Sequence, residues 1–252
     1  MNYFAPKSAA ERYSRGRPYF HENTIRRIKK YLGLEEKLDK ALDIACGTGL
    51  STIALLAIAE NVYGTDSSEE MLKLALPHRN INFSIAPAEN QPFDDMEFDL
   101  ITVSSGVHWF TIDKLLSEAN RLLKPDAWLV IYDNFFIAEM NDASEFNNWF
   151  PEIYLKRFPS PPRNENFDWI NGHADFTLTN EEKFKNAISF TKEELILYFT
   201  TQSNITSIVE NGINTYSEIE NWLDKELSPF FTNENKRTVN FGNWIKYLKR
   251  NN

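Results

Sequence analysis

The stretch DIACGTG, residues 43–49, ends a short apolar run and leads into a second apolar segment, LSTIALLAIA, residues 50–59. The first run is typical of a buried strand and the second of a buried helix. Glycines at positions 47 and 49 permit a tight turn and a close approach of the backbone to a ligand. The N–H groups that open the following helix have no partners within it, so they favour a negatively charged group. This stretch therefore predicts a ligand-binding edge of an α/β sheet.

The same alternation continues along the first half of the chain. Further strands are expected at 61–66, 81–85, 98–104 and 127–132, and helices at 22–33, 67–76 and 113–123. Short links between such elements imply right-handed crossovers and a parallel, doubly wound sheet. Ligands bind beyond the carboxyl ends of the strands in such a sheet. The turns that follow Ala45, Asp66, Ile85 and Ser104 are therefore expected along one rim.

The second half of the chain lacks this alternation. Residues 134–182 are rich in Phe, Trp, Asn and Pro. Helices are expected at 191–201 and 216–227, and strands at 186–190 and 239–248, the last at an edge of the sheet. In the first of these helices, Thr191 and Glu194 stand at capping-box spacing. This half predicts helices inserted over the ligand face and two strands that complete the sheet.

Charge and composition exclude several classes of protein. The net charge is −9, from 27 basic and 36 acidic residues, which argues against bulk electrostatic binding to nucleic acid or to anionic lipid. No apolar stretch approaches the ~20 residues that a transmembrane helix needs. The first twenty residues lack the apolar run of a signal peptide, and the one cysteine fits a reducing compartment. We therefore expect a cytoplasmic protein with no nucleic-acid or membrane partner, either a monomer or a dimer.

A dinucleotide-binding protein uses the same glycine turn, but two features count against it. The third small position of G-x-G-x-x-G is occupied by Thr52, and the second half offers no further βαβαβ unit for a nicotinamide. Asp43 stands in the strand ahead of the turn, where its carboxylate can organise turn amides or face a cationic ligand. Asp66 ends the next strand, where an acid can accept hydrogen bonds from both ribose hydroxyls of a nucleoside.

Four stretches in this order carry a resemblance to a known family. They are DIACGTG (43–49), VYGTDSSEEML (62–72), APAENQPFDDMEFDLI (86–101) and RLLKPDAWLVI (121–131). The chain resembles the class I S-adenosylmethionine-dependent methyltransferases over about residues 5–133. His-Trp-Phe at 108–110 makes it most similar to the small-molecule type, the trans-aconitate methyltransferase-like group. One departure is Pro125-Asp126-Ala127, where the family has Pro-Gly-Gly, which puts the turn before the fifth strand in question.

The resemblance implies a Rossmann-like doubly wound α/β sheet with the strand order 3-2-1-4-5-7-6 and an inserted helical cover. It implies one methyltransferase domain over residues 1–252. The implied parts are an N-terminal cover segment (1–34), a cofactor-binding core (35–133), an inserted acceptor cover (134–185) and sheet-completing helices and strands (186–252).

S-adenosylmethionine is the cofactor that the resemblance implies. The residues implied to bind it are Tyr13, Arg17, Asp43, Ala45, Cys46, Gly47, Gly49, Asp66, Ser67, Ala88, Glu89 and Ser104. Among them, Asp66 would hold the ribose, Ala88 and Glu89 would flank the adenine, and Arg17 is a candidate for the cofactor carboxylate. Cys46 and Glu89 could also have no role in binding. Cys46 would then be a packing residue, and Glu89 would be a solvated acid.

His108, Trp109 and Phe110 are implied to form the acceptor pocket. The sulfonium cofactor is already activated, so such an enzyme mainly aligns the acceptor with the methyl group and excludes water. A carboxylate acceptor needs no strong base at neutral pH, whereas a hydroxyl does. His108 is then the candidate catalytic base, since its reference pKa is ~6.5. Lining of the pocket is the competing interpretation of His108.

We therefore expect methyl transfer from S-adenosylmethionine to a small organic acceptor, a carboxylate or a hydroxyl. Two alternatives remain open at this point. One is a protein that binds the cofactor without catalysis, and the other is a methyltransferase that acts on a protein or an RNA. No metal site is expected, because the four histidines are isolated and no Cys/His spacing matches a zinc site.

Overall fold

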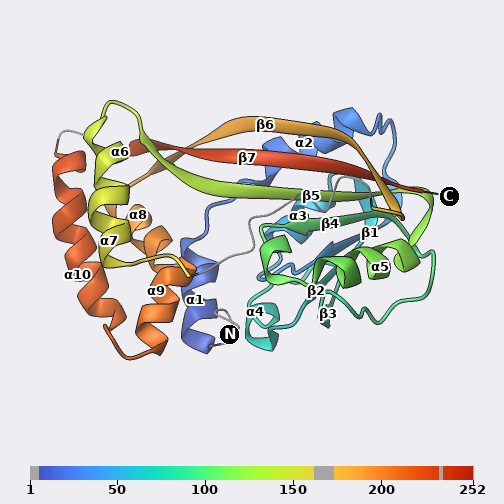
Figure 1. The fold of residues 1–252 in the computed structure, drawn as a ribbon, viewed down its shortest axis with the longest axis horizontal. Coiled ribbons are helices and arrows are strands. Elements are labelled where there is room, and N and C mark those ends of the chain that lie inside the picture. The colour runs from blue at the N-terminus through green and yellow to red at the C-terminus, as the bar shows by residue number, and fades with distance from the viewer. Residues whose placement is uncertain (1–5, 162–172, 233–234, 252) are drawn as a thin grey trace. The chain divides into compact units, whose positions relative to one another are not determined.

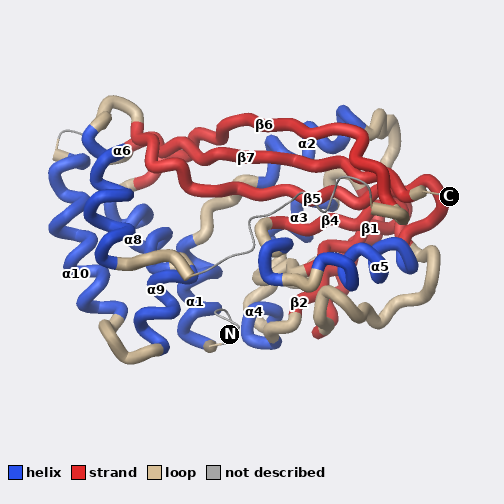
Figure 2. Tube along the Cα trace, viewed as in Figure 1, coloured by secondary structure: helices blue, strands red, loops and turns tan. Residues whose placement is uncertain are grey.

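The computed structural model describes residues 6–161, 173–232 and 235–251. These residues form a seven-stranded sheet with the order β3-β2-β1-β4-β5-β7-β6 (Figures 1 and 2). The strands are β1 (Leu38–Ile44), β2 (Ala59–Asp66), β3 (Ile81–Ile85), β4 (Phe98–Ser104), β5 (Leu123–Met140), β6 (Phe176–Phe190) and β7 (Arg237–Arg250). The predicted sheet class and strand order are confirmed. One detail was wrong, because β7 lies between β5 and β6 rather than at an edge.

Helices connect and flank these strands. They are α1 (Lys7–Gly16), α2 (His21–Tyr31), α3 (Leu50–Leu55), α4 (Glu69–Leu72), α5 (Ile112–Leu122), α6 (Glu145–Trp149), α7 (Leu155–Arg157), α8 (Lys192–Thr200), α9 (Ser203–Glu210) and α10 (Tyr216–Leu227). Shorter helical turns are η1 (Val107–Trp109), η2 (Phe150–Tyr154) and η4 (Ser228–Phe231). The expected capping box of Thr191 and Glu194 is present at the start of α8.

The chain divides into two compact units, each built from several segments. We call Tyr19–Asn134, Arg163–Phe184 and Asn243–Asn252 the sheet unit. We call Met1–Pro18, Phe135–Pro162 and Lys185–Gly242 the helical unit. The strands β5, β6 and β7 continue from one unit into the other. The segment 134–185, predicted as an inserted cover, begins in β5, continues through α6, η2 and α7, and ends in β6. Its residues 162–172 lie outside the described residues.

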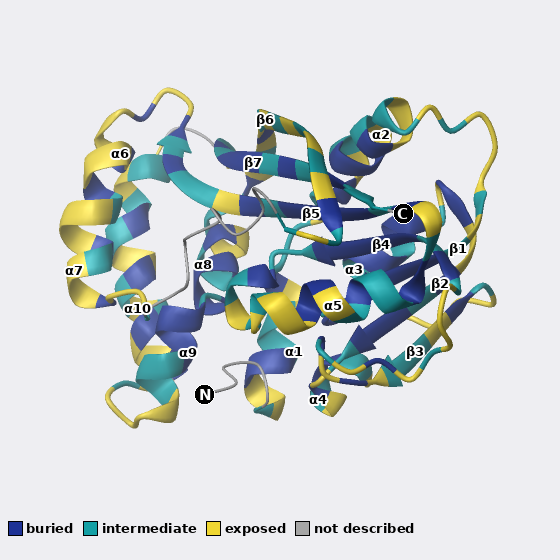
Figure 3. Cartoon of the chain, turned by 45° about the vertical axis from the view of Figure 1, so that its right-hand side comes forward, coloured by how far each residue is buried: buried dark blue, intermediate teal, exposed yellow. Residues whose placement is uncertain are grey.

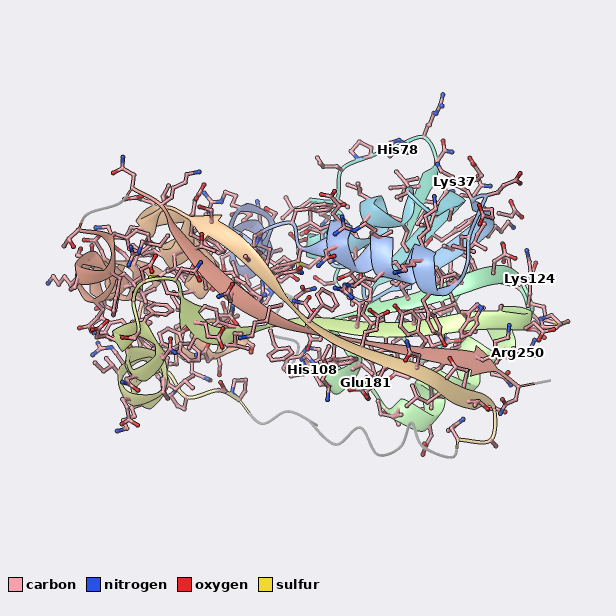
Figure 4. The ribbon with its side chains drawn as sticks, turned by 90° about the horizontal axis from the view of Figure 1, so that it is seen from above. Lys37, His78, His108, Lys124, Glu181 and Arg250 are labelled. Atoms are coloured by element: carbon pink, nitrogen blue, oxygen red, sulfur yellow. The ribbon has the colours of Figure 1, made fainter. Side chains whose placement is uncertain are left out.

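In the sheet unit, the strand pairs from β3 to β5 are parallel. The register places Ile44 opposite Thr65 and Val103, and Ser104 opposite Tyr132. The carboxyl ends of these strands consequently lie along one edge, as the sequence predicted. In Figure 4, His108, which follows β4, lies at the opposite end of the sheet unit from Lys124, which opens β5.

The core of the sheet unit has two layers because side chains of a strand alternate between faces. Leu42, Ile44 and Ile101 pack on one face with the apolar side of α5. Ala41 and Leu100 pack on the other face with α2 and α3. The central strands β1 and β4 are consequently buried over most of their length, whereas α5 alternates between buried and exposed residues (Figure 3). Asp43, Thr102 and Ser104 share the face of Ala41 and Leu100.

Pro125-Asp126-Ala127, which departs from the Pro-Gly-Gly of the family, forms an irregularity near the start of β5. Phe98 pairs with Leu123 and Leu100 pairs with Trp128, so β5 advances five residues while β4 advances two. Asp126 adopts the left-handed conformation with φ of 60°, which aspartate tolerates better than most residues. The turn that the sequence left in question is therefore formed without the family glycine.

The helical unit has an aromatic core. Phe136 contacts Phe146, Phe199 and Phe241 with ring centroids 5.3–6.0 Å apart. Most of the large aromatic residues in this part of the chain are buried, and they include Phe146, Trp149, Tyr154, Phe158, Tyr198 and Phe199. Edge and offset contacts between aromatic rings add to the free energy gained by burial. These residues thus form a core of the helical unit.

Candidate functional site

The turn after β1 is held in an unusual backbone conformation. Ala45, Gly47 and Gly49 all have positive φ, at 58°, 56° and 80°. The N–H of Cys46 donates to the carbonyl of Thr65 on β2 at 2.9 Å, which fixes the start of the turn. A Cβ at Gly49 would lie 2.8 Å from the ring of Phe83. Both the conformation and the close contact therefore require glycine at position 49.

Asp66 joins this turn to the end of β2. One carboxylate oxygen accepts a hydrogen bond from the Gly47 N–H at 2.9 Å, and the other accepts one from the Ser68 N–H at 2.8 Å. Burial raises the pKa of Asp66 above its ordinary value, and these N–H groups offset part of the rise. A carboxylate has about four acceptor positions, so this one keeps capacity to accept a hydrogen bond from a ligand hydroxyl.

Asp43 is fully buried and acts as an acceptor for three hydroxyl groups. Ser51 Oγ and Thr52 Oγ1 donate to one oxygen at 2.6 and 2.8 Å, and Thr102 Oγ1 donates to the other at 3.0 Å. Burial raises the pKa of Asp43 to about 6, against the effect of the three hydroxyls. The carboxylate thus ties the first turn of α3 and the middle of β4 to β1. Its hydrogen-bond donors among the described residues are hydroxyls rather than turn amides.

The loop after β3 is built from buried and braced residues. Ala88 is buried. Glu89 Oε1 accepts a hydrogen bond from the N–H of Thr111, the N-cap of α5, at 2.9 Å. Gln91 Nε2 donates to the carbonyl of Pro87 at 2.8 Å. Glu89 therefore links the loop after β3 to the loop after β4.

The loop after β4 carries the predicted acceptor residues. Ser105 has a φ of 53°, and its N–H donates to the carbonyl of Tyr132 at 2.9 Å. Val107, at the start of η1, is buried and anchors the turn. His108 lies against Trp109 with ring centroids 4.6 Å apart, and Trp109 is 37% exposed. The loop thus presents an imidazole and an indole at the carboxyl edge of the sheet, with Phe110 following them.

Two predicted cofactor residues belong to the helical unit. The guanidinium of Arg17 lies 4.8 Å from the ring centroid of Tyr13 and 5.4 Å from that of Tyr198. Arg17 Nη2 also donates to the carbonyl of Thr201 at 3.4 Å. The structure therefore brings Tyr13 and Arg17 together with each other, in a cation–π contact on the packed surfaces of α1 and α8.

The remaining predicted cofactor residues are Cys46, Ser67 and Ser104, of which Ser104 is the last residue of β4. The Cys46 thiol is buried, and burial raises its pKa well above the ordinary value. A thiol in this state is inert rather than nucleophilic, as expected for a packing residue. Ser67 is exposed beside Asp66.

The sequence offered Ser67 or Ser68 as the N-cap of the helix after β2, and Ser68 is the residue that caps α4; it also donates its N–H to Asp66. Other polar residues at this edge escaped sequence reasoning. Thr102 reaches Asp43 only because β4 pairs with β1. Tyr132 and His21 form a buried pair whose members are 111 residues apart in the chain. No local signal marks Thr102, Tyr132 or His21, because their contacts depend on strand pairing and on residues distant in the sequence.

Within the part of the chain that the structure describes, no group of three or more His, Cys, Asp or Glu residues has the geometry to hold a metal ion. No helix among the described residues is both long and apolar enough to cross a membrane.

The residues at the carboxyl edge fit a nucleoside that bears an amino-acid group. Asp66 has acceptor capacity for a ribose hydroxyl, and Ala88 and Glu89 follow β3 beside it in the sheet order. The turn at 45–49 lies between these elements and the loop after β4, and its glycine conformations allow a close approach. The edge is thus suited to a ligand of this kind.

Comparisons with known proteins point in the same direction. A family model described as a methyltransferase domain matches residues 42–131. The chain is 35% identical over 178 residues to a demethylmenaquinone methyltransferase of Staphylococcus aureus, covering 66% of this chain and 71% of that protein.

Solved structures agree on the fold. One is the structure of a type II methyltransferase, as its name reads, from Anaeromyxobacter dehalogenans. It has a TM-score of 0.71 at 20% identity, and the match covers 92% of this chain and 97% of that chain. A phosphoethanolamine N-methyltransferase of Haemonchus contortus, in complex with S-adenosyl-L-methionine, has a TM-score of 0.52 at 17% identity. The match covers 98% of this chain and 57% of that chain.

Proposed function

Because this chain belongs to the class I S-adenosylmethionine-dependent methyltransferases, we propose that it transfers the methyl group of that cofactor to a small organic acceptor, a carboxylate or a hydroxyl. The methyltransferase activity and the cofactor follow from the family. The acceptor and the residues assigned to each part of the site are our proposal. The observation that carries this assignment is the hydrogen-bonded junction of Asp66 with the glycine turn.

In the proposed site, Asp66 holds the ribose and Ala88 and Glu89 flank the adenine. The turn at 45–49 and Ser104 lie along the methionyl group. Tyr13 and Arg17 belong to the helical unit, and their contact with the cofactor stays a prediction from the sequence. The cofactor supplies a methyl group that is already activated on a sulfonium. The protein therefore has to position this group, exclude water and orient the acceptor.

His108, Trp109 and Phe110 are proposed to face the acceptor. The partial exposure of Trp109 and its ring contact with His108 support this assignment, because both rings are then available to an acceptor. For a hydroxyl acceptor, His108 takes the proton as the oxygen attacks the methyl group. For a carboxylate acceptor, which is already ionised, His108 only lines the pocket.

Two other functions are weighed against this one. A protein that binds the cofactor without catalysis predicts tight binding and no turnover with any acceptor. A methyltransferase for RNA needs a basic surface, whereas the chain carries a net charge of −9. A basic peptide would suit this charge, so a protein acceptor is the alternative to include in the assay.

The proposal is tested in two stages. In a thermal-shift assay, S-adenosylmethionine and S-adenosylhomocysteine should stabilise the protein and NAD should not. Labelled cofactor is then screened against small carboxylic acids, phenols, amines and a basic peptide. Turnover with the peptide alone, or with nothing despite tight binding, would contradict the proposed acceptor class.

The part played by His108 is tested with the acceptor found in the screen. If that acceptor is a hydroxyl, His108→Ala should lower the methyl-transfer rate by about 10²-fold or more. His78→Ala, which alters an exposed histidine before β3, is the matched control and should leave the rate unchanged. If His108→Ala methylates a hydroxyl acceptor at an unchanged rate, His108 is not the catalytic base.

A further inference from the structure

The loop after β3, residues 86–97, forms neither helix nor strand. It contains Ala88 and Glu89, the two residues assigned to the adenine. Phe93 anchors this loop in the core, with its ring centroid 5.4 Å from that of Tyr63 and 5.0 Å from that of Phe98. One anchored side chain does not fix the course of a loop backbone, whose polar groups need partners that a helix or a ladder would otherwise supply. Other elements must therefore hold this backbone.

Arg121, in the last turn of α5, contacts the loop at alternate residues. Its Nη1 donates to the Phe93 carbonyl and to Asp95 Oδ1, both at 2.8 Å. Its Nη2 donates to the Gln91 carbonyl at 3.2 Å and to Glu118 Oε1 at 2.7 Å, and its Nε donates to Glu118 Oε2 at 3.0 Å. A guanidinium has five N–H donors in a fixed planar fork, and these five hydrogen bonds use all of them. Arg121 is therefore committed to the loop and to Glu118, with no donor left for a ligand.

Glu118, one turn earlier in α5, contacts both the guanidinium and the loop. Its Oε1 accepts the N–H of Gln91 at 2.7 Å, in addition to the Nη2 of Arg121. The hydrogen bonds from Arg121 hold the pKa of Glu118 below its ordinary value, so the carboxylate stays charged at neutral pH. The Glu118 side chain is 11% exposed, so salt screens this pair less than it screens a surface pair. The N–H and the carbonyl of Gln91 are thus both held by α5.

Gln91 carries this constraint to the residues assigned to the adenine. Its side-chain Nε2 donates to the carbonyl of Pro87 at 2.8 Å, and the N–H of Asn90 donates to the same carbonyl at 3.2 Å. Ala88 and Glu89 lie inside the turn that these hydrogen bonds close. Their placement therefore depends on Gln91, which α5 holds.

We propose that Arg121 and Glu118 are positioning residues for base recognition, which hold the loop after β3 in the shape that distinguishes adenine from other bases. They act through Gln91 rather than by contact with the ligand. A base is recognised by hydrogen-bonding groups at fixed positions, and a hydrogen bond weakens steeply when its distance or angle is wrong. A displaced loop therefore loses discrimination between bases. The inference rests on the proposed placement of the adenine at Ala88 and Glu89.

Two ligands that differ only in the base distinguish positioning from a general structural contribution. S-adenosylhomocysteine carries adenine, whereas S-inosylhomocysteine carries hypoxanthine, in which a carbonyl oxygen replaces the exocyclic amino group. The wild type should bind S-adenosylhomocysteine about tenfold more tightly, as expected when a hydrogen-bonding group of the loop loses its partner. Arg121→Lys keeps the positive charge but lacks the planar fork. In isothermal titration calorimetry it should weaken S-adenosylhomocysteine binding about tenfold and leave S-inosylhomocysteine binding unchanged.

Lys124→Gln is the matched control. Lys124 follows α5 and pairs with Asp99 at 2.8 Å, and its side chain is 36% exposed against 34% for Arg121. This variant should leave both affinities unchanged. An Arg121→Lys protein that keeps the wild-type preference for adenine, or that loses affinity equally for both ligands, would overturn the inference.

Glu118→Gln is a milder variant in case Arg121→Lys fails to fold. Its amide oxygen can still accept the Gln91 N–H, but the side chain no longer forms a charged pair with Arg121. The preference for adenine should fall by about threefold or more. A preference equal to that of the wild type contradicts the inference.

Amide hydrogen exchange shows where a variant has changed. In Arg121→Lys or Glu118→Gln, exchange should be faster in residues 87–93 and unchanged in β1 and β4, because local opening differs from global unfolding. Faster exchange throughout the sheet unit would instead mean general destabilisation and would contradict the inference. The wild type supplies the remaining criterion. Equal affinity for the two ligands overturns the inference, whereas a wild type that binds neither ligand contradicts the proposed function instead.

Discussion

The carboxylate of Asp66 accepts the N–H of Gly47 at 2.9 Å, so the last residue of β2 holds the turn that follows β1. The acid assigned to the ribose and the glycine turn assigned to the methionyl group are thereby one hydrogen-bonded unit. A change at either residue is expected to disturb both parts of the cofactor site.

Asp66→Asn should weaken S-adenosylhomocysteine binding by about tenfold or more, because the amide replaces one acceptor oxygen by a donor. Isothermal titration calorimetry measures the effect. Asp39→Asn, at the amino end of β1, is the control and should bind as the wild type does. An affinity that Asp66→Asn leaves intact would remove Asp66 from the ribose site.

Gly49→Ala should lower the free energy of unfolding by more than an ordinary glycine replacement does. The residue has a φ of 80°, and a Cβ there would lie 2.8 Å from the Phe83 ring. Gly33→Ala is the matched control, since Gly33 also has a positive φ, of 63°, but its Cβ would meet nothing within 4 Å. We expect about 1 kcal/mol of destabilisation for Gly33→Ala, and a larger loss together with impaired cofactor binding for Gly49→Ala.

Phe83→Leu in the Gly49→Ala background separates the two causes. It should recover the part of the loss that comes from the steric contact and none of the part that comes from φ. Equal unfolding free energies for the two single glycine variants in urea titrations would rule out the steric contribution.

Thr102→Val should destabilise the fold by about 1–2 kcal/mol, because it removes one of the three hydroxyls that donate to the buried Asp43 carboxylate. Thr102→Ser keeps the hydroxyl and should lose less of this stability. Urea denaturation measures both free energies. If the Thr102→Val variant is as stable as the Thr102→Ser variant, the hydroxyl contributes nothing to the stability of the β1–β4 junction.

His21 should make stability depend on pH in a defined direction. Its pKa is about 4 in the folded chain against 6.5 ordinarily, so below pH 6.5 the unfolded chain binds a proton that the folded chain does not. Stability is therefore lost as the pH falls toward 4, by up to about 3 kcal/mol. His21→Gln should remove this loss.

Asp43 acts in the opposite direction over the same range. Its pKa is about 6 in the folded chain against 3.8 ordinarily, so its contribution is present below pH 3.8 and is lost as the pH rises through 6. Both the wild type and His21→Gln contain Asp43, so the difference in their stability reports on His21. His21→Gln should become more stable relative to the wild type on acidification from pH 7 to 4.5. A difference between the two proteins that stays constant over this range would contradict the lowered pKa of His21.

Local patterns identified the first half of the sheet well. The bounds of β3 and β4 agree with the predicted 81–85 and 98–104, because apolar runs between turn residues define both strands. The sequence was less informative for β6, which spans Phe176–Phe190 although only 186–190 was expected. The middle of its sequence, NEEKFKN at 180–186, consists mostly of Asn, Glu and Lys, which are depleted in strands. Pairing with β7 in the sheet order overrides that weak preference.

The sequence by itself determined the glycine turn, the acid that ends β2 and the strand order, because these signals depend on neighbouring residues and on motifs in a fixed order. Only the tertiary structure decided which side chains complete the edge. Thr102 lies 59 residues from Asp43, and Tyr132 lies 111 residues from His21. Such contacts arise from strand register and from the packing of α2 on the sheet, and no periodicity in the chain encodes them.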